Sequence, residues 1–176
     1  MRKGLISVLL RFVAGHMWTQ IVGKIRMAHA PLLNHWWQVT LYVSPRGLTT
    51  SAVPHRTGAF EIEFDFVGHR LEVRSSDGGT RSLPLRPMPV AEFYTRVLAM
   101  LDQLGIEAAI RPHPNEVEPA IPFAEDHVHA SYDGEAATLF WRRRPGDAPA
   151  PARAPRCQQN ARDPSGRTGT RRSQCT

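Results

Sequence analysis

The first 141 residues contain no cysteine, because Cys157 and Cys175 are the two cysteines of the chain. This part therefore has neither a disulfide framework nor a thiolate metal site, and cysteine use gives no sign of an oxidising compartment. Long hydrophobic runs are also absent, since no segment reaches the ~20 mostly apolar residues that a membrane-spanning helix needs. The sequence thus argues against a disulfide-rich secreted domain and predicts no membrane partner.

The N-terminus matches a targeting signal only in outline. Arg2 and Lys3 precede an apolar run, but Arg11 interrupts that run. A small-x-small site, Ala28-His29-Ala30, lies far beyond the run and would be followed by Pro31. These features argue against a secretory signal, so we expect a cytoplasmic protein.

Common catalytic motifs are missing as well. The chain has no G-x-S-x-G elbow, no G-x-x-x-x-G-K phosphate loop, no G-x-G-x-x-G fingerprint and no H-E-x-x-H pair. The sequence therefore predicts neither a particular reaction nor a particular cofactor, and it leaves open whether the protein is an enzyme.

The net charge of +6 comes from the end of the chain. Residues 142–176 hold nine arginines and two aspartates, so residues 1–141 carry a net charge of −1. The same segment has no Leu, Ile, Val, Phe, Tyr or Trp, which predicts a disordered basic tail. Without interleaved aromatic side chains, these arginines predict no specific nucleic-acid partner. Because the composition changes abruptly within a helical pattern, our hypothesis is that the tail is an out-of-frame reading of GC-rich DNA.

Hydrophobic patterning predicts one α+β domain over residues 16–141, preceded by an extension, residues 1–15, of uncertain structure. We expect a mainly antiparallel β-meander packed against two or three helices. The clearest signal is strict alternation of apolar residues with acidic ones, Phe60, Ile62, Phe64 and Phe66 with Glu61, Glu63 and Asp65. Such alternation is typical of a strand with one buried face. We interpret the acidic row as a solvated sheet face, while paired carboxylates for acid–base chemistry are the alternative.

The remaining elements follow from periodicity and turn residues. Helical spacing predicts helices over residues 16–30 and 90–104, and a last helix capped by Asp133, with an apolar face that includes Ala136, Ala137, Leu139 and Phe140. Strands are predicted over residues 36–43, 48–53, 70–74 and 106–110, and around Leu83 and Leu85, where Pro84 indicates an edge strand. Gly68-His69 predicts a two-residue type II′ hairpin turn.

Several long motifs occur in the same order as in a known protein family. They are Trp18-Thr19-Gln20-Ile21-Val22-Gly23-Lys24-Ile25-Arg26, Asn34-His35-Trp36-Trp37, Leu41-Tyr42-Val43, Arg46-Gly47-Leu48-Thr49-Thr50, the alternating strand with His69-Arg70-Leu71, Pro122-Phe123, Glu125-Asp126 and His129-Ala130-Ser131-Tyr132-Asp133. Over about residues 17–143 the chain resembles a bacterial family known only as domain of unknown function 5996. The resemblance implies membership and no activity. The chain departs from the family in its first 15 residues, at Gly134, where the family has proline, and in its tail, which replaces the family's longer last helix and further strands.

Three histidines fall inside these motifs, His35, His69 and His129, and they are candidate ligands for a divalent metal, with carboxylates of Glu125, Asp126 and Asp133 near in sequence. None of the spacings is a recognised metal motif. The alternative is that these are turn, cap and surface histidines.

Adjacent tryptophans on a strand point to opposite faces, so Trp36 or Trp37 could line a pocket beside Asn34 and His35. Arg46 could hold an anionic group. We therefore predict a small-molecule-binding domain with a His/Trp-lined pocket, whose candidate ligand-binding residues are Asn34, His35, Trp36, Trp37, Arg46, His69, His129 and Asp133. The alternative function is a structural or protein-interaction module without chemistry. The sequence indicates no ligand identity and no oligomeric state.

Overall fold

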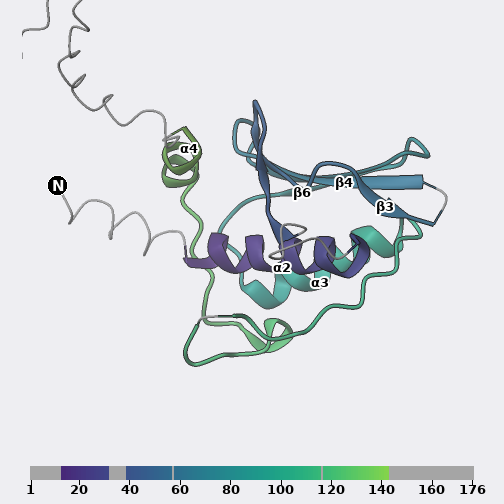
Figure 1. The fold of residues 1–176 in the computed structure, drawn as a ribbon. Helices are drawn as coiled ribbons and strands as arrows, with labels where there is room; N and C mark the ends of the chain where they lie inside the picture. The colour runs from purple at the N-terminus through teal and green to yellow at the C-terminus, as the bar shows by residue number, and fades with distance from the viewer. Residues whose placement is uncertain (1–12, 32–38, 57, 116, 143–176) are drawn as a thin grey trace, which may run out of the picture. The chain divides into compact units, whose positions relative to one another are not determined.

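An antiparallel sheet with two helices on one of its faces forms the centre of the domain (Figure 1). The computed structural model describes residues 13–31, 39–56, 58–115 and 117–142. The predicted extension, residues 1–15, and the predicted tail, residues 142–176, lie almost entirely outside these ranges. No helix among the described residues is long and apolar enough to cross a membrane.

Among the described residues, the sheet has six strands, all paired antiparallel, in the order β1-β2-β4-β5-β6, with β3 paired to β4 as well. Their bounds are β1 Tyr42–Val43, β2 Gly47–Thr49, β3 Val53–His55, β4 Gly58–Asp65, β5 Arg70–Ser75 and β6 Thr80–Pro84. The helices are α2 Val13–His29, α3 Val90–Asp102 and α4 Gly134–Arg142, and Phe123–Glu125 forms a short 3₁₀ turn. The predicted α+β class is therefore confirmed, as is the edge position of the strand that contains Pro84.

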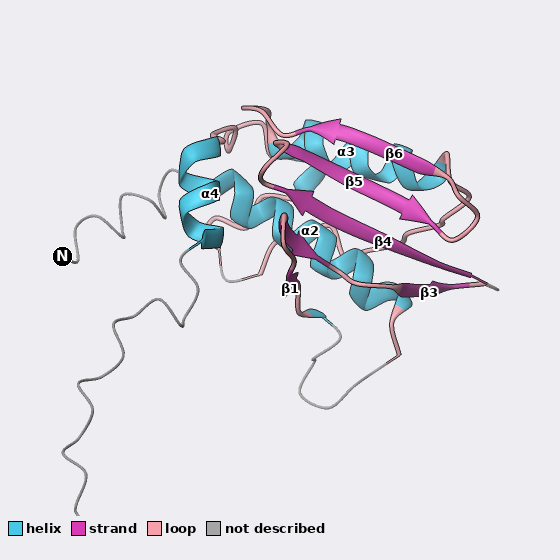
Figure 2. Ribbon diagram, turned by 90° about the horizontal axis from the view of Figure 1, so that it is seen from above, coloured by secondary structure: helices cyan, strands magenta, loops and turns pink. Residues whose placement is uncertain are grey.

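The inward row of β4 supplies the centre of the core. Phe60, Ile62 and Phe64 are buried and face α2 and α3, which lie behind the sheet in the view of Figure 2. The Trp18 ring on α2 stacks on the Phe93 ring on α3, with centroids 4.6 Å apart. Period-2 alternation on the strand and 3.6-residue spacing on the helices thus bury one continuous apolar layer between sheet and helices.

Helix α3 begins at the predicted residue and ends two residues early. The N–H of Leu104 donates to the carbonyl of Leu101 (3.0 Å), so the last turn tightens, and Gly105 adopts a φ of 70°. The N–H of Ile106 then turns back to the Leu101 carbonyl (2.9 Å). Residues 106–110 consequently join no strand, and the predicted strand there is wrong.

Two other predicted strands are shorter in the structure. Of residues 36–43, the described part contributes only β1, while residues 48–53 are split between β2 and β3. The split occurs at Ser51, whose φ is 53°, a left-handed conformation that a continuous strand does not contain.

The β4–β5 connection is a four-residue loop, residues 66–69, because Asp65 pairs with Arg70. The predicted two-residue turn at Gly68-His69 is therefore wrong. The Asp65 Oδ1 accepts the N–H groups of Val67 (3.0 Å) and Gly68 (2.8 Å), which fixes the loop, and His69 takes the left-handed position with a φ of 48°.

Candidate functional site

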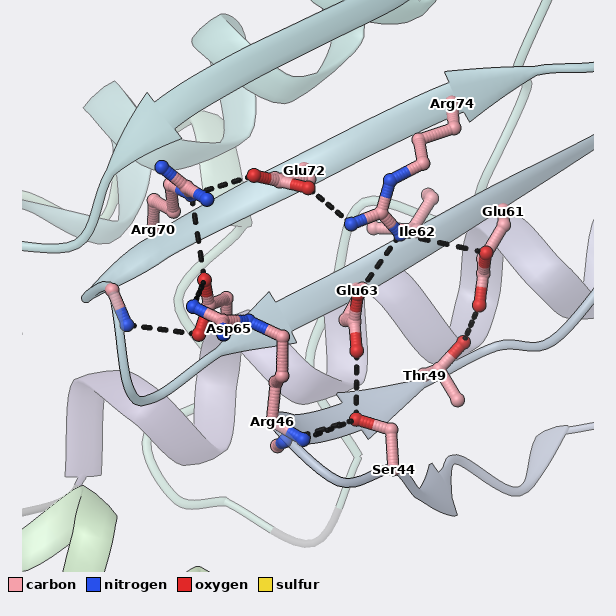
Figure 3. Close-up of polar contacts among 12 residues, drawn as sticks. Ser44, Arg46, Thr49, Glu61, Ile62, Glu63, Asp65, Arg70, Glu72 and Arg74 are labelled. Carbon is pink, nitrogen blue, oxygen red and sulfur yellow. Dashed lines mark hydrogen bonds and ion pairs between the residues drawn. The ribbon is translucent and has the colours of Figure 1, made fainter.

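The face of the sheet opposite α2 and α3 carries a ring of hydrogen bonds and ion pairs (Figure 3). Because side chains alternate, Glu63 and Asp65 on β4 share this face with Arg70, Glu72 and Arg74 on β5. We call the set Ser44, Arg46, Glu63, Asp65, Arg70, Glu72 and Arg74 the charged ring.

The β5 side of the ring alternates arginine and glutamate. Glu63 and Glu72 stand directly opposite each other, a like-charge pair that destabilises a sheet unless something compensates it. Arg74 compensates it, with Nη1 2.9 Å from Glu63 Oε2 and Nη2 bonded to Glu72. Arg70 Nε lies 2.5 Å from Glu72 Oε1 and 3.4 Å from Asp65 Oδ2.

The β1–β2 turn closes the ring. The Ser44 hydroxyl accepts the N–H groups of Arg46 (3.2 Å) and Gly47 (2.9 Å) and donates to Glu63 Oε1 (2.7 Å). Arg46 Nη2 then donates to Asp65 Oδ2 at 2.8 Å. Sequence reasoning missed Ser44, although a serine just before a Pro-x-Gly turn is a recognisable turn signal.

The ring is layered, with carboxylates below and guanidinium groups above. The side chains of Asp65, Glu63 and Glu72 are 1%, 9% and 13% exposed. Those of Arg46, Arg70 and Arg74 are 47%, 46% and 39% exposed. The acidic row is therefore largely buried, and the prediction of a solvated acidic face is wrong for Glu63 and Asp65. Within the charged ring, the side chains that are exposed to solvent are mainly those of the arginines.

Asp65 is the anchor of this arrangement. Burial alone would raise the pKa of its carboxyl group, but hydrogen bonds from Arg46, Gly68 and Val67 outweigh burial and hold that pKa below its usual range. The hydrogen bond between Arg46 and Asp65 also raises the pKa of the Arg46 guanidinium. Asp65 is thus ionised at neutral pH and fixes the direction of the Arg46 guanidinium.

Three predicted site residues, Arg46, His69 and Asp133, lie around the β4–β5 loop. His69 Nδ1 is 3.1 Å from the Tyr132 hydroxyl. Asp133 Oδ1 accepts the N–H of Ala136 (3.0 Å), so its predicted role as the cap of the last helix is confirmed. A Cβ at Gly134 would lie 2.7 Å from Cε1 of the His69 ring. Glycine at this position therefore leaves room for that ring.

His129 has a different role, at the start of α3. Its Nδ1 lies 2.8 Å from Oδ2 of the buried Asp126. The carbonyls of His129 and Asp126 accept the N–H groups of Val90 and Ala91, both at 3.0 Å. This segment thus satisfies the first N–H groups of α3, which have no partner inside the helix.

The predicted His/Trp pocket falls mostly outside the described residues, since Asn34, His35, Trp36 and Trp37 all lie there. Within the described ranges, no group of three or more His, Cys, Asp or Glu side chains is arranged to hold a metal ion.

Tyr132 gives the site a measurable pH dependence. Burial raises its pKa to about 12, and the carboxylates of Asp133 and Asp65 add to the shift. An unfolded tyrosine ionises near pH ~10, so folding keeps Tyr132 neutral at a pH where the unfolded chain loses its proton. Stability from this group is present below pH ~10 and is lost as pH rises towards 12.

We therefore expect wild-type protein to lose stability between pH ~10 and ~12 more steeply than Tyr132→Phe. Thermal melts across that range measure the slope, and near-ultraviolet absorbance should show a phenolate transition near pH 12 that Tyr132→Phe lacks. Identical slopes for the two proteins would contradict the assigned environment of Tyr132.

Comparison with known proteins gives a family and no activity. No curated protein and no solved structure matches the chain. The model of one family, described as a family of unknown function, matches residues 12–144, which include the sheet, the described helices α2, α3 and α4, and the charged ring. The chain therefore belongs to the family of unknown function DUF5996.

Proposed function

We propose that the domain binds a small anionic molecule, bearing a carboxylate or phosphate group, on the outer face of its sheet. The observation that carries this proposal is the layering of the charged ring, in which half-exposed arginines stand over buried carboxylates. Carboxylates beneath the arginines orient the guanidinium groups before any ligand arrives, which lowers the entropic cost of binding.

The arginines have guanidinium N–H groups that the contacts of the ring do not use. Arg46 uses Nη2 and Arg70 uses Nε in their ring contacts. The other N–H groups of these two side chains make no contact within the charged ring, and planar guanidinium donors match the oxygens of carboxylate and phosphate. With Glu61, which lies 3.5 Å from Arg74, the cluster contains four carboxylates and three arginines. The carboxylates thus offset the positive charge of the arginines, so binding of an anion should be of modest affinity and should weaken with salt.

Calorimetric titration with inorganic phosphate at low ionic strength tests the proposal. Arg46→Gln and Arg70→Gln should each weaken binding by about tenfold, the loss of ~1.5 kcal/mol of charge-assisted hydrogen bonding. The matched control is Arg96→Gln on α3, because Arg96 is 45% exposed and is likewise paired with a carboxylate, at 2.8 Å from Glu92. The proposal fails if the control weakens binding as much, or if wild-type protein binds no phosphate.

A protein-interaction module is the second candidate, and exposed apolar side chains favour it. Helix α4 turns Ala136 and Ala137 inward, but Leu139 and Phe140 are 48% and 51% exposed. The predicted apolar face of this helix is thus wrong for those two residues. Tyr42, Val43 and Val67 are also exposed, and where such side chains form one contiguous patch they mark a contact site. An apparent molecular mass that rises with protein concentration in sedimentation experiments would support self-association.

The location that we propose is the cytoplasm of a bacterium. The absence of cysteine from residues 1–141 and the resemblance to a bacterial family support it. We propose no membrane partner and no specific nucleic-acid partner, and cell fractionation tests the location directly.

A further inference from the structure

An open cavity of about 260 Å³ lies where β3, β4, β5 and the chain that follows α3 meet. Figure 2 shows the end of β3, the end of β5 and the end of α3 on the same side of the domain, away from α4. The core residues Phe60 and Ile106 line the cavity, so it opens on the helix side of the sheet and not on the face of the charged ring. A cavity of this volume takes a molecule smaller than a typical drug.

Contacts between the sheet and the chain after α3 hold the walls of the cavity in place. Nε2 of His55 on β3 lies 3.2 Å from the carbonyl oxygen of Gly105. A carbonyl can only accept, so Nε2 carries the proton of the neutral ring and Nδ1 is an acceptor. A Cβ at Gly79 would lie 2.7 Å from Cδ2 of Leu104, which places the β5–β6 turn directly against the same segment. The cavity is therefore formed before a ligand arrives.

Acceptor groups line the cavity from the β5–β6 turn and from β3. Asp77, the exposed carboxylate of that turn, places Oδ1 3.8 Å from the position that a Cβ on Gly58 would take. The carboxylate therefore lies beside the first residue of β4, and both residues line the cavity. An ammonium group has three donors and no acceptor, so Asp77 and Nδ1 of His55 are suitable partners for one.

Donor groups line the cavity from the β3–β4 turn and from the end of β5. Nη2 of Arg56 lies 2.9 Å from Oε1 of Glu107, a contact that uses one N–H of a guanidinium group that has five. The Ser76 hydroxyl accepts the N–H of Ala59 at 3.1 Å, so its own proton is directed elsewhere and can be donated. A guanidinium group beside a hydroxyl matches the oxygens of a carboxylate.

We propose that this cavity binds a small α-amino acid as its zwitterion, with the ammonium group at Asp77 and His55 and the carboxylate at Arg56 and Ser76. A simple anion would be repelled by Asp77 and a simple cation by Arg56, whereas a zwitterion satisfies both. The volume and the mainly polar lining favour glycine, alanine and serine over larger amino acids. The site is separate from the charged ring and does not depend on anion binding there.

Nuclear magnetic resonance titration of the full-length protein with glycine, L-alanine and L-serine, at constant pH and ionic strength, tests the proposal. At least one of the three should give saturating shifts of the backbone amide signals of Ala59, Ser76 and Asp77. Asp77→Asn and Arg56→Gln should each weaken this binding by about tenfold, because each removes a charge-assisted hydrogen bond. Both positions are exposed, so the variants should keep the dispersed amide spectrum of the folded protein.

The matched controls are Asp102→Asn and Arg96→Gln, which remove exposed charges from α3 without touching the lining of the cavity. Two altered ligands test the two halves of the site, since serine methyl ester lacks the carboxylate and N-acetylserine lacks the ammonium group. Each should bind more weakly than serine. The proposal is overturned if none of the three amino acids gives saturating shifts, or if the controls weaken binding as much as Asp77→Asn and Arg56→Gln. Equal binding of serine and either altered ligand would overturn the assignment of a zwitterion.

Discussion

Gly47→Ala is expected to lower the free energy of unfolding by at least about 3 kcal/mol, the upper range for an overpacked interior site. A Cβ at this position would lie 1.8 Å from the carbonyl oxygen of Phe64 and 3.1 Å from the Phe66 ring. The nearest obstacle is backbone of the central strand β4, so it cannot move aside as a side chain would. Relief would require β2 and β4 to separate, which also breaks the ring contacts of Arg46 and Ser44.

Urea denaturation measures the effect, and Gly78→Ala is the control. Gly78 has a φ of 88°, and a Cβ at that position would have no atom within 4 Å. The same substitution there therefore costs only the strain of a left-handed alanine, about 1 kcal/mol. If Gly47→Ala costs no more than Gly78→Ala, the close approach of β2 to β4 is wrong.

Asp65→Asn should cost about 2–3 kcal/mol and also weaken phosphate binding. The carboxylate is 1% exposed and accepts from Arg46, Val67 and Gly68. Asparagine keeps the shape and one acceptor oxygen, but it removes the charge that orients Arg46 and Arg70. A loss of stability without a loss of binding would separate the fold from the proposed function.

The pH dependence of stability has a definite sign. The folded-state pKa of Asp65 is lowered, so its stabilising contribution is present above the unfolded value of ~3.9 and is lost as pH falls through the folded value. Wild-type protein should therefore lose stability on acidification below pH ~4 more steeply than Asp65→Asn. Asp77→Asn, at an exposed turn, is the matched control and should retain the wild-type slope.

The alternating strand shows what sequence can predict. Strict alternation from Phe60 to Phe66 located β4, and the following turn and apolar pair located β5. Both rest on local periodicity, which one sequence displays fully. The same pattern assigns Glu63 and Asp65 to the outer face but carries no information on what lies above them. Their burial depends on arginines from β5 and from the β1–β2 turn.

Other errors also have non-local causes. Residues 106–110 have strand-like composition, yet Ile106 bonds back to α3, and the Glu107 carbonyl lies 2.9 Å from Nε2 of His29. Leu139 and Phe140 fit a helical stripe, but α4 is placed by contacts made elsewhere on the helix, such as Trp141 Nε1 to the Ser44 carbonyl (3.2 Å). Periodicity defines a face of a helix, and tertiary contacts decide which part of that face is covered.

The candidate site was predicted in part. Arg46, His69 and Asp133 stood out within family-like motifs, whereas Asp65 was assigned to the solvated face. The spacing of the first helix also does not show that Lys24 is buried, at 5% exposed. The partners of Lys24 lie about 90 residues away at Asn115, beyond the reach of helical spacing.

The most direct test of anion binding at the charged ring is a nuclear magnetic resonance titration of the arginine Nε–H signals with inorganic phosphate. The account predicts that the signals of Arg46, Arg70 and Arg74 shift together and saturate, while that of Arg96 stays in place. Equal small shifts of all four signals, or a saturating shift confined to arginines outside the ring, would contradict it.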